Sequence, residues 1–172
     1  GITEQDIKVA GFVHEQNKPS VIVLNKWDLI EDKDDKTINK FRKKLDEDLK
    51  FMSYYIPVFI SVKTGQRVGK IMETVETVLK NASKRISTGQ LNDIVQEAIN
   101  MKQPPSKNGQ RLKILYATQT GINPPNFVIF VNNKDIMHFS YLRYLENTLR
   151  KAVDYSGTPI KLIVKNRSEK DE

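Results

Sequence analysis

The sequence predicts an α/β domain followed by a smaller α+β domain with the element order αββαβ. In the first half, strand-like β-branched runs alternate with amphipathic helical patterns, as in part of a doubly wound parallel sheet. In the second half, one helical pattern is followed by two strand-like runs, and a second helical pattern is followed by a third strand-like run. A polar stretch at 86–90 separates the halves, so we expect domains at 1–85 and 86–172.

The elements of the first half follow from capping residues and apolar periodicity. Thr3 can cap a helix that carries Asp6 in its first turn and ends near Asn17. The further elements expected are a strand at 20–24, a helix over about 38–49, a strand at 55–61 and a helix over about 68–84. This order, αβαβα, places the residues that follow each strand at the sheet edge where α/β proteins bind ligands.

The second half is predicted to form a three-stranded sheet with its helices on one face. We expect a helix at 91–101, a turn at Asn108-Gly109, strands at 111–119 and 126–131, a helix at 139–154 and a strand at 159–164. The apolar stripes of both helices need a common surface to cover, which favours a single face. Alternation in the last strand places Lys161, Ile163 and Lys165 on the opposite side from Leu162 and Val164.

The composition is that of an ordinary soluble globular protein. Of the 172 residues, 38% are hydrophobic and 28% are charged, and no apolar run approaches the roughly 20 residues that a membrane-spanning helix needs. With no cysteine and only two histidines, we expect neither a disulfide framework nor a metal site. A cytoplasmic location and no membrane partner are therefore expected.

The charge and the two ends of the chain add further expectations. The net charge of +7 is shared between the halves and is compatible with an anionic partner such as RNA. Gly1 lacks both an initiator Met and a leader-like sequence after it, so we expect it to be a cut end. We expect Ser168 to Glu172 to form a loose polar tail.

A guanine-recognition motif follows the first predicted strand. The tetrapeptide is Asn25-Lys26-Trp27-Asp28, which has the pattern Asn-Lys-x-Asp. The Asp28 carboxylate can accept both N–H donors on one edge of guanine, whereas adenine would leave it unpaired. Asn25 can bond the base and tie the loop to its neighbours, and the stem of Lys26 can lie over the base plane. We expect the Trp27 side chain to pack beside the loop, with only its backbone near the ligand.

A second loop supports this interpretation. The next predicted strand ends in Ser61-Val62-Lys63-Thr64-Gly65, which resembles the Ser-Ala-x-x-Gly loop whose backbone N–H meets the guanine O6. The phosphate-binding pattern G-x-x-x-x-G-K-[ST] and the switch segments are absent from the sequence. We therefore assign no catalytic residue, and expect this chain alone neither to hydrolyse GTP nor to bind it tightly.

Three segments of the second half resemble the C-terminal domain of the Der (EngA) family of bacterial GTPases. They are Pro124 to Asn132, His138 to Arg150, and Gly157-Thr158-Pro159-Ile160. The resemblance covers essentially the whole chain. It implies the end of a second G domain, of the P-loop GTPase type, followed by a KH-like domain.

The same resemblance implies the function of the full-length protein. It implies two consecutive G domains, binding of GTP or GDP with Mg²⁺, and a role in ribosome biogenesis during large-subunit assembly. The implied partners are the large ribosomal subunit with its rRNA and the first G domain of the same protein. DNA is not an implied partner. The guanine-binding residues implied here are Asn25, Lys26, Trp27, Asp28, Ser61, Val62 and Lys63.

Several residues carry both a functional and a structural interpretation. His138 is expected to cap or pack rather than act as a base, and the acidic loop Glu31 to Asp35 to be solvated rather than to bind metal. The aromatic residues Phe127, Phe130, Phe139, Tyr141 and Tyr144 could stack on RNA bases, but their spacing makes most of them core residues. The candidate RNA contacts are Lys107, Arg111, Lys113, Arg143, Arg150, Lys151, Lys161, Lys165 and Arg167.

Three classes of function remain open from the sequence. The first is part of a ribosome-assembly GTPase, and the second is a non-enzymatic module that binds RNA or the ribosome. The third is a domain that docks onto another protein. The G-x-x-G loop with which RNA-binding KH domains clamp nucleotides is absent from the sequence, so we expect contacts to RNA shape and charge rather than base-specific readout.

Overall fold

The first helix begins at a complete capping box. The computed structural model describes residues 2–31 and 33–167. Helix α1 (Glu4–Glu15) starts after Thr3, whose hydroxyl accepts the Asp6 N–H while the Asp6 carboxylate accepts the Thr3 N–H at 2.9 Å. These reciprocal bonds satisfy two N–H groups that a helix start leaves without partners. The predicted cap is confirmed.

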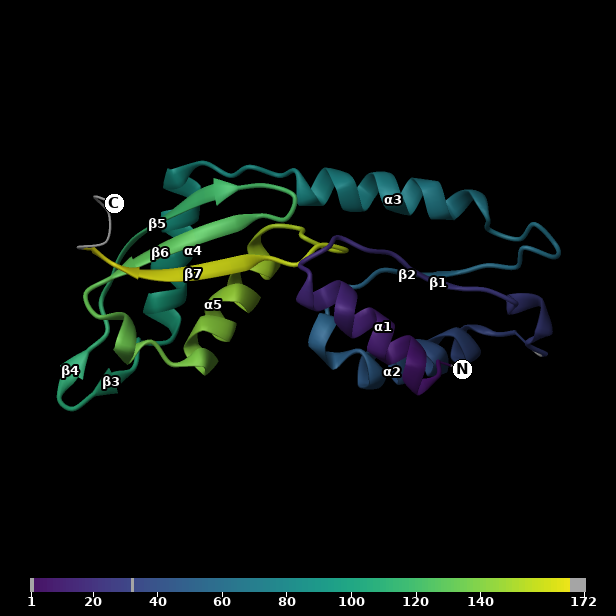
Figure 1. The fold of residues 1–172 in the computed structure, drawn as a ribbon, viewed down its shortest axis with the longest axis horizontal. Helices are drawn as coiled ribbons and strands as arrows, with labels where there is room; N and C mark the ends of the chain where they lie inside the picture. The colour runs from purple at the N-terminus through teal and green to yellow at the C-terminus, as the bar shows by residue number, and fades with distance from the viewer. Residues whose placement is uncertain (1, 32, 168–172) are drawn as a thin grey trace. The chain divides into compact units, whose positions relative to one another are not determined.

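The chain divides into two units. The first contains the residues up to Ala82 together with Tyr155–Pro159, and the second contains Ser83–Asp154 and the residues from Ile160 onward. After α1 the first unit contains β1 (Ile22–Leu24), η1 (Trp27–Leu29), α2 (Asp35–Asp48), η2 (Lys50–Met52), β2 (Pro57–Phe59) and α3 (Gly69–Ala82) (Figure 1). The predicted order αβαβα is confirmed, with strands of three residues each.

The two strands of the first unit are parallel. Ile22 pairs with Pro57 and Leu24 with Phe59. Trp27 is only 3% exposed, and its ring centroid lies 4.8 Å from that of Phe59 and 5.3 Å from that of Phe41. These aromatic contacts join the end of β1 to α2 and β2, so the loop after β1 is fixed by the core of the unit.

A short segment from late in the sequence completes the first unit. We call Tyr155–Pro159 the strap. The Gly157 N–H donates to the Tyr54 carbonyl at 2.6 Å, and the Gly157 carbonyl accepts the Ser20 N–H at 2.9 Å. Tyr155 and Thr158 are almost fully buried. The strap therefore bonds to the backbone just before both strands, at the opposite end of the sheet from the predicted guanine loops.

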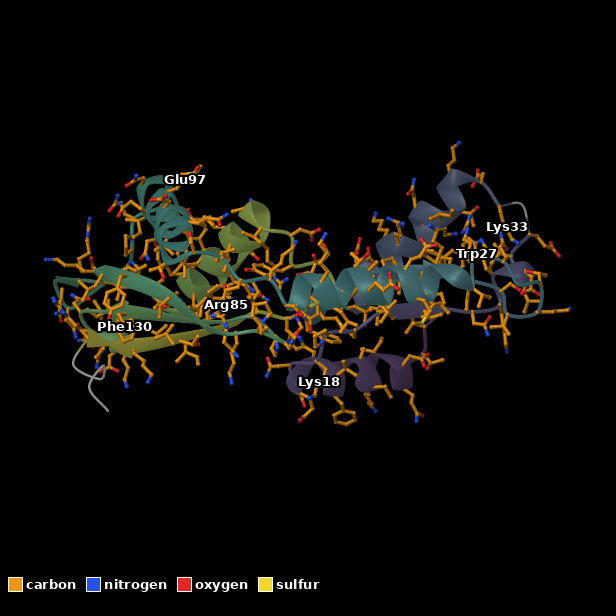
Figure 2. All side chains as sticks on the ribbon, turned by 90° about the horizontal axis from the view of Figure 1, so that it is seen from above. Lys18, Trp27, Lys33, Arg85, Glu97 and Phe130 are labelled. Atoms are coloured by element: carbon orange, nitrogen blue, oxygen red, sulfur yellow. The ribbon has the colours of Figure 1, made fainter. Side chains whose placement is uncertain are left out.

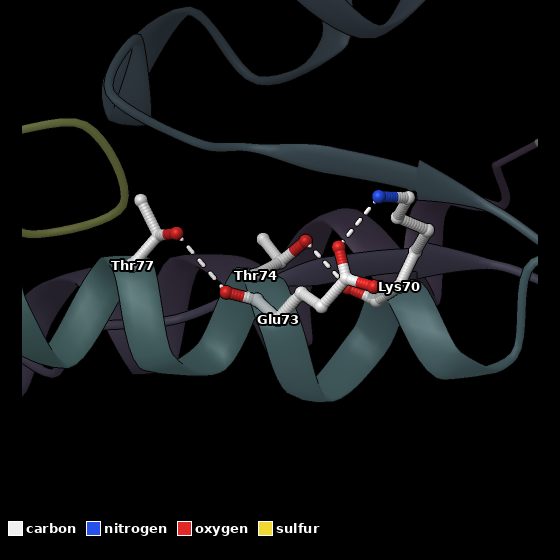
Figure 3. Close-up of polar contacts among 4 residues, drawn as sticks. All are labelled: Lys70, Glu73, Thr74 and Thr77. Atoms are coloured by element: carbon white, nitrogen blue, oxygen red, sulfur yellow. Dashed lines mark hydrogen bonds and ion pairs between the residues drawn. The ribbon is translucent and has the colours of Figure 1, made fainter.

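Helix α3 presents a polar surface over its first turns (Figure 3). The Lys70 ammonium lies 2.5 Å from the Glu73 carboxylate, and the Thr74 hydroxyl donates to the Lys70 carbonyl at 2.7 Å. The Thr77 hydroxyl bonds the Glu73 carbonyl in the same way at 3.0 Å. Because these groups bond within their own helix, this face needs no partner from another element.

The second unit has the predicted αββαβ core. Its elements are α4 (Thr88–Met101), β3 (Ser106–Lys107), β4 (Gln110–Arg111), β5 (Ile114–Gly121), β6 (Asn126–Val131), η3 (Lys134–Ile136), α5 (Phe139–Ala152) and β7 (Lys161–Asn166). The sheet order is β5-β6-β7, antiparallel and then parallel. The small β3–β4 hairpin was not predicted as a separate pair of strands, since Arg111 was assigned to the strand at 111–119, but its turn at Asn108-Gly109 was predicted.

Helices α4 and α5 pack on the same face of this sheet (Figure 2). Apolar side chains from both helices meet those of Ala117, Phe127, Ile129 and Leu162 around a very small cavity. Asn92 of α4 also bonds the edge strand, because its side chain donates to the Ala117 carbonyl and accepts the Ala117 N–H, at 2.9 and 2.8 Å. The predicted arrangement of helices on one face is confirmed for this unit.

Several expected boundaries differ in the structure. The expected strand at 111–119 is divided, with Arg111 in β4 and the longer strand β5 beginning at Ile114. The Ser87 hydroxyl accepts the Gln90 N–H and caps α4, so most of the expected linker at 86–90 is helix. The last strand begins at Lys161 rather than 159, because Pro159 belongs to the strap. The predicted polar tail, and Asp32 of the acidic loop, lie outside the described residues.

Candidate functional site

The structure brings together the two loops that the sequence singled out. Beyond the paired strands, the Ile60 N–H donates to the Leu24 carbonyl at 2.8 Å and the Trp27 N–H donates to the Ile60 carbonyl at 2.9 Å. These bonds continue the parallel ladder past both strand ends. They fix residues 25–28 beside residues 61–65, at the sheet edge where α/β folds bind ligands.

Asn25 ties the two loops to each other. Its side-chain oxygen accepts the N–H of Lys26 at 2.7 Å and the N–H of Val62 at 3.1 Å. In the resembled Ser-Ala-x-x-Gly loop a backbone N–H meets the guanine O6, whereas in this structure the Val62 N–H donates to Asn25. A base oxygen at this position therefore has to share or replace the Asn25 contact.

Lys26 turns the chain sharply away from the strand. Its backbone is left-handed, with φ 64° and ψ 31°, a conformation that costs a residue with a side chain about 1–2 kcal/mol. The bond from its N–H to Asn25 and the bond from the Leu29 N–H to its carbonyl, at 3.0 Å, hold this turn. Such strain is typical of residues that a binding loop must orient.

Asp28 is held by a hydroxyl of the second loop. The Ser61 hydroxyl donates to Asp28 Oδ1 at 2.6 Å and accepts the Thr64 N–H at 3.2 Å. The Ser61 hydrogen bond lowers the pKa of the Asp28 carboxyl, and the Asp28 backbone N–H and the ammonium groups of Lys63 and Lys33 act in the same direction. Asp28 is therefore an oriented carboxylate at neutral pH, able to accept hydrogen bonds from a ligand.

The remaining guanine candidates divide between the core and the surface. The Trp27 indole is buried in the core, as its position in the motif predicts, while Val62 is 63% exposed and Lys63 is exposed beside it. Trp27 and Lys33 lie at the same end of the first unit (Figure 2). The arrangement can thus bind a flat polar ligand between the two loops, with charged groups around it.

An open groove of about 660 Å³ runs beside β1. It is lined mainly by apolar side chains of α1, β1 and the region around Leu49 and Met52. Asn25 and Lys26 border it, whereas Asp28 and Ser61 do not. Because the polar groups of Asp28 and Ser61 lie outside its lining, we describe the groove separately from the polar site.

Most candidate RNA contacts of the second unit lie at its surface. Exposed side chains are those of Lys107, Arg111, Lys113, Arg143, Lys151, Lys161 and Arg167, and Lys165 is half-buried. Arg150 is only 14% exposed and lies 3.2 Å from the Glu146 carboxylate, so it is bound within α5. Arg150 is therefore the weakest candidate of the set.

The aromatic side chains and His138 have mostly structural roles. The His138 ring accepts the Ser140 N–H at 3.2 Å and caps α5, as predicted. The Tyr141 hydroxyl donates to the Lys102 carbonyl at the end of α4, and burial raises the pKa of Tyr141 to about 12, so the hydroxyl remains a donor near neutral pH. Phe127 and Phe130 are buried, whereas Phe139 is 72% exposed.

Metal-binding clusters and membrane-spanning helices were sought among the described residues. No group of three or more His, Asp or Glu side chains within residues 2–31 and 33–167 is placed to hold a metal ion. None of the helices in this part of the chain is long and apolar enough to cross a bilayer.

Known proteins resemble this chain over its whole length. Residues 85–165 match the family model for the C-terminal, KH-domain-like part of EngA bacterial GTPase enzymes. The GTPase Der of Desulfitobacterium hafniense (strain Y51) is 52% identical over 172 residues, which cover 100% of this chain and 39% of that protein. The GTPase Der of Ruminiclostridium cellulolyticum is 54% identical over 171 residues, covering 99% of this chain and 38% of the relative.

The chain thus spans about two fifths of the length of these curated relatives. Its second unit is a KH-like domain, in agreement with the αββαβ core and the matched family model. Because the identity extends over the first unit as well, the chain as a whole belongs to the Der (EngA) family of bacterial GTPases, where it corresponds to the C-terminal part.

Proposed function

We propose that the first unit is the guanine-recognising part of a GTP-binding domain, in a full-length GTPase that acts in the cytoplasm during assembly of the large ribosomal subunit. The observation that carries the proposal is the orientation of the Asp28 carboxylate. Ser61 donates a hydrogen bond to it, and Asn25 joins the loop of Asp28 to the loop of Ser61. The KH-like unit is proposed to contact ribosomal RNA.

The geometry of Asp28 supports selection of guanine. A carboxylate accepts hydrogen bonds only, and guanine offers two adjacent N–H donors, on N1 and on its exocyclic amine. With Ser61 holding Oδ1, the carboxylate is fixed in plane and can receive the pair as a fork. Adenine has an acceptor at N1 instead, and this nitrogen would face the negatively charged Asp28 carboxylate without forming a hydrogen bond.

The groove beside β1 supports the proposal that more of the domain packs here. Among the described residues, β1 pairs with β2 alone, and the groove beside it is lined by residues of core type such as Ile22 and Leu24. The curated relatives are far longer than this chain. We propose that the phosphate-binding half of the domain occupies this groove in the full-length protein.

We therefore propose that residues outside this sequence bind the phosphates and Mg²⁺. The two loops fit a guanine base, but no P-loop pattern is present to cradle phosphates or hold Mg²⁺. When bound to the full-length protein, Mg²⁺ would neutralise phosphate charge during hydrolysis. The residues of this chain orient the base and, through it, the rest of the nucleotide.

A prediction for the chain by itself follows. Most affinity for a nucleotide in such domains comes from its phosphates, so residues 1–172 should bind GDP far more weakly than roughly 1 μM, which corresponds to about 8 kcal/mol. GDP and guanosine should bind with similar affinity, because no phosphate contact distinguishes them. Isothermal titration calorimetry with GDP, guanosine and adenosine measures both quantities. Submicromolar binding of GDP would contradict this prediction.

The non-enzymatic alternative rests on the charge of the second unit. Residues 83–154 and 160–167 contain thirteen Lys and Arg against five Asp and Glu. If the guanosine titration gave no preference over adenosine, the first unit would be a scaffold and RNA binding would be the main activity. A preference for guanosine supports the GTPase proposal, whatever the second unit binds.

A further inference from the structure

We propose that Phe139 is a base-stacking contact for single-stranded RNA on the KH-like unit. The proposal deepens the RNA-binding part of the proposed function and does not depend on guanine recognition by the first unit. It assigns a residue and a kind of contact to one end of this unit. That end is formed by the last turn of α4, the β3–β4 hairpin, η3 and the first turn of α5 (Figure 1).

Phe139 is an exception among the phenylalanine side chains of its unit. It is 72% exposed, whereas Phe127 and Phe130 are at most 8% exposed. The buried stripe of α5 contains Tyr141, Leu145 and Leu149, and Phe139 lies two residues before the first of these. Two residues correspond to about 200° around a helix, so the phenyl ring points away from the sheet.

The backbone that carries this ring is well ordered by local bonds. The His138 side chain bonds both the backbone N–H and the hydroxyl of Ser140, and its ring centroid lies 4.9 Å from that of Phe139. The Tyr141 hydroxyl bonds the Lys102 carbonyl at 2.8 Å and holds the start of α5 against the end of α4. An exposed ring on a fixed backbone loses little conformational entropy on binding, which favours its use as a contact.

The charges around Phe139 favour a nucleic acid over an apolar protein surface. Arg143 follows Phe139 by four residues on the same face of α5 and is exposed, so a ligand on the ring lies within reach of its guanidinium. Exposed cations of the neighbouring elements at this end of the unit are those of Lys102, Lys107, Arg111, Lys113 and Lys134. Asp135 is the acidic residue of η3 and is the exception among these charges.

An aromatic ring beside cationic side chains is suited to bind single-stranded RNA. Every base has a flat face that can stack on a phenyl ring, and the phosphates on either side pair with Arg and Lys. Duplex RNA hides its base faces in the stack and offers only phosphates and 2′-hydroxyls. The proposed contact therefore distinguishes single strands from duplexes without reading a particular base sequence.

The experiment measures the affinity of the whole chain for labelled RNA by fluorescence anisotropy. The probes are a single-stranded oligonucleotide of mixed sequence and a duplex of the same length. Phe139→Ala should weaken single-strand binding about tenfold and leave duplex binding unchanged, whereas Phe139→Trp should retain the affinity. The matched control is Phe12→Ala, which removes a phenyl ring that is 64% exposed on the first unit and should change neither affinity.

Salt dependence separates stacking from charge. Arg143→Gln should reduce the slope of log affinity against log salt by about 0.7, the value for one phosphate contact on a single strand, whereas Phe139→Ala should leave the slope unchanged. Equal effects of Phe139→Ala and Phe12→Ala would overturn the proposal. Absence of single-strand binding by the unaltered chain would also overturn it, and would point to a protein partner for this surface. Neither result bears on guanine recognition by the first unit.

Discussion

Replacing Asp28 by asparagine in the full-length protein is expected to weaken GTP binding at this domain by roughly 10²- to 10⁴-fold. The carboxylate is proposed to accept two hydrogen bonds from guanine, and each charge-assisted bond contributes about 1.5–3 kcal/mol. An amide in its place turns one acceptor into a donor and sets it against an N–H group of the base. Xanthine carries an oxygen at that position, so xanthosine nucleotides should gain affinity. Calorimetry with the other G domain disabled by mutation measures both changes.

Ser61→Ala is the matched control for this prediction. It keeps the Asp28 carboxylate but removes the hydroxyl that donates to Oδ1 at 2.6 Å. The carboxylate therefore keeps both acceptor oxygens and loses the hydrogen bond that orients it. A loss of about tenfold without any gain for xanthosine nucleotides is expected, from one hydrogen bond of about 1.5 kcal/mol. Unchanged GTP affinity in Asp28→Asn would show that this carboxylate does not bind the base.

The positions of the two loops could be predicted because each follows a short strand that is defined by local sequence. A short buried strand followed by polar residues defines Asn25 to Asp28, and the next such strand defines Ser61 to Gly65. Parallel pairing of β1 and β2 then places both loops at one edge. The sequence predicted that Asn25 ties its loop to its neighbours, but not that the Val62 N–H is the partner, because that depends on the rotamer of one amide side chain.

The helix boundaries show which signals were available and missed. Ser87 has the side chain of a helix cap, and α4 begins directly after it, but the polar composition of 86–90 favoured a linker. The exposure of Phe139 also had a signal, since the helical angle between it and Tyr141 separates the two faces of α5. For Ser87 the polar composition of the segment outweighed the capping residue, and for Phe139 the interpretation of the aromatic residues as a group outweighed its own angle on the helix.

The strap could not be predicted from local sequence. Gly157, Thr158 and Pro159 follow a helix and precede a strand of the second unit, so their position along the chain assigns them to that unit. In the structure they pack in the first unit, where Gly157 bonds Tyr54 and Ser20. Partners so distant in sequence leave no periodic pattern, and only the fold reveals them.

Replacing Gly157 by alanine is expected to destabilise the first unit by roughly 2–5 kcal/mol. Gly157 has a left-handed backbone with φ +82°, and a Cβ there would lie 2.1 Å from Cγ2 of Val78, a buried residue of α3. A left-handed conformation costs a residue with a side chain about 1–2 kcal/mol, and overpacking a core costs about 1–3 kcal/mol. Urea unfolding followed by the fluorescence of Trp27, the single tryptophan and a core residue of this unit, measures the loss.

The two contributions can be separated within the same unit. Gly65 also has a left-handed backbone, with φ +76°, but nothing lies within 4 Å of a Cβ added there, so Gly65→Ala should cost only the conformational part, about 1–2 kcal/mol. In a Val78→Ala background, Gly157→Ala should likewise fall toward that smaller cost, because the methyl group that blocks its Cβ has been removed. If Gly157→Ala and Gly65→Ala destabilise the unit equally, the strap is not packed against α3 in solution. A larger loss at Gly157 that Val78→Ala relieves would establish the strap as part of the core of the first unit.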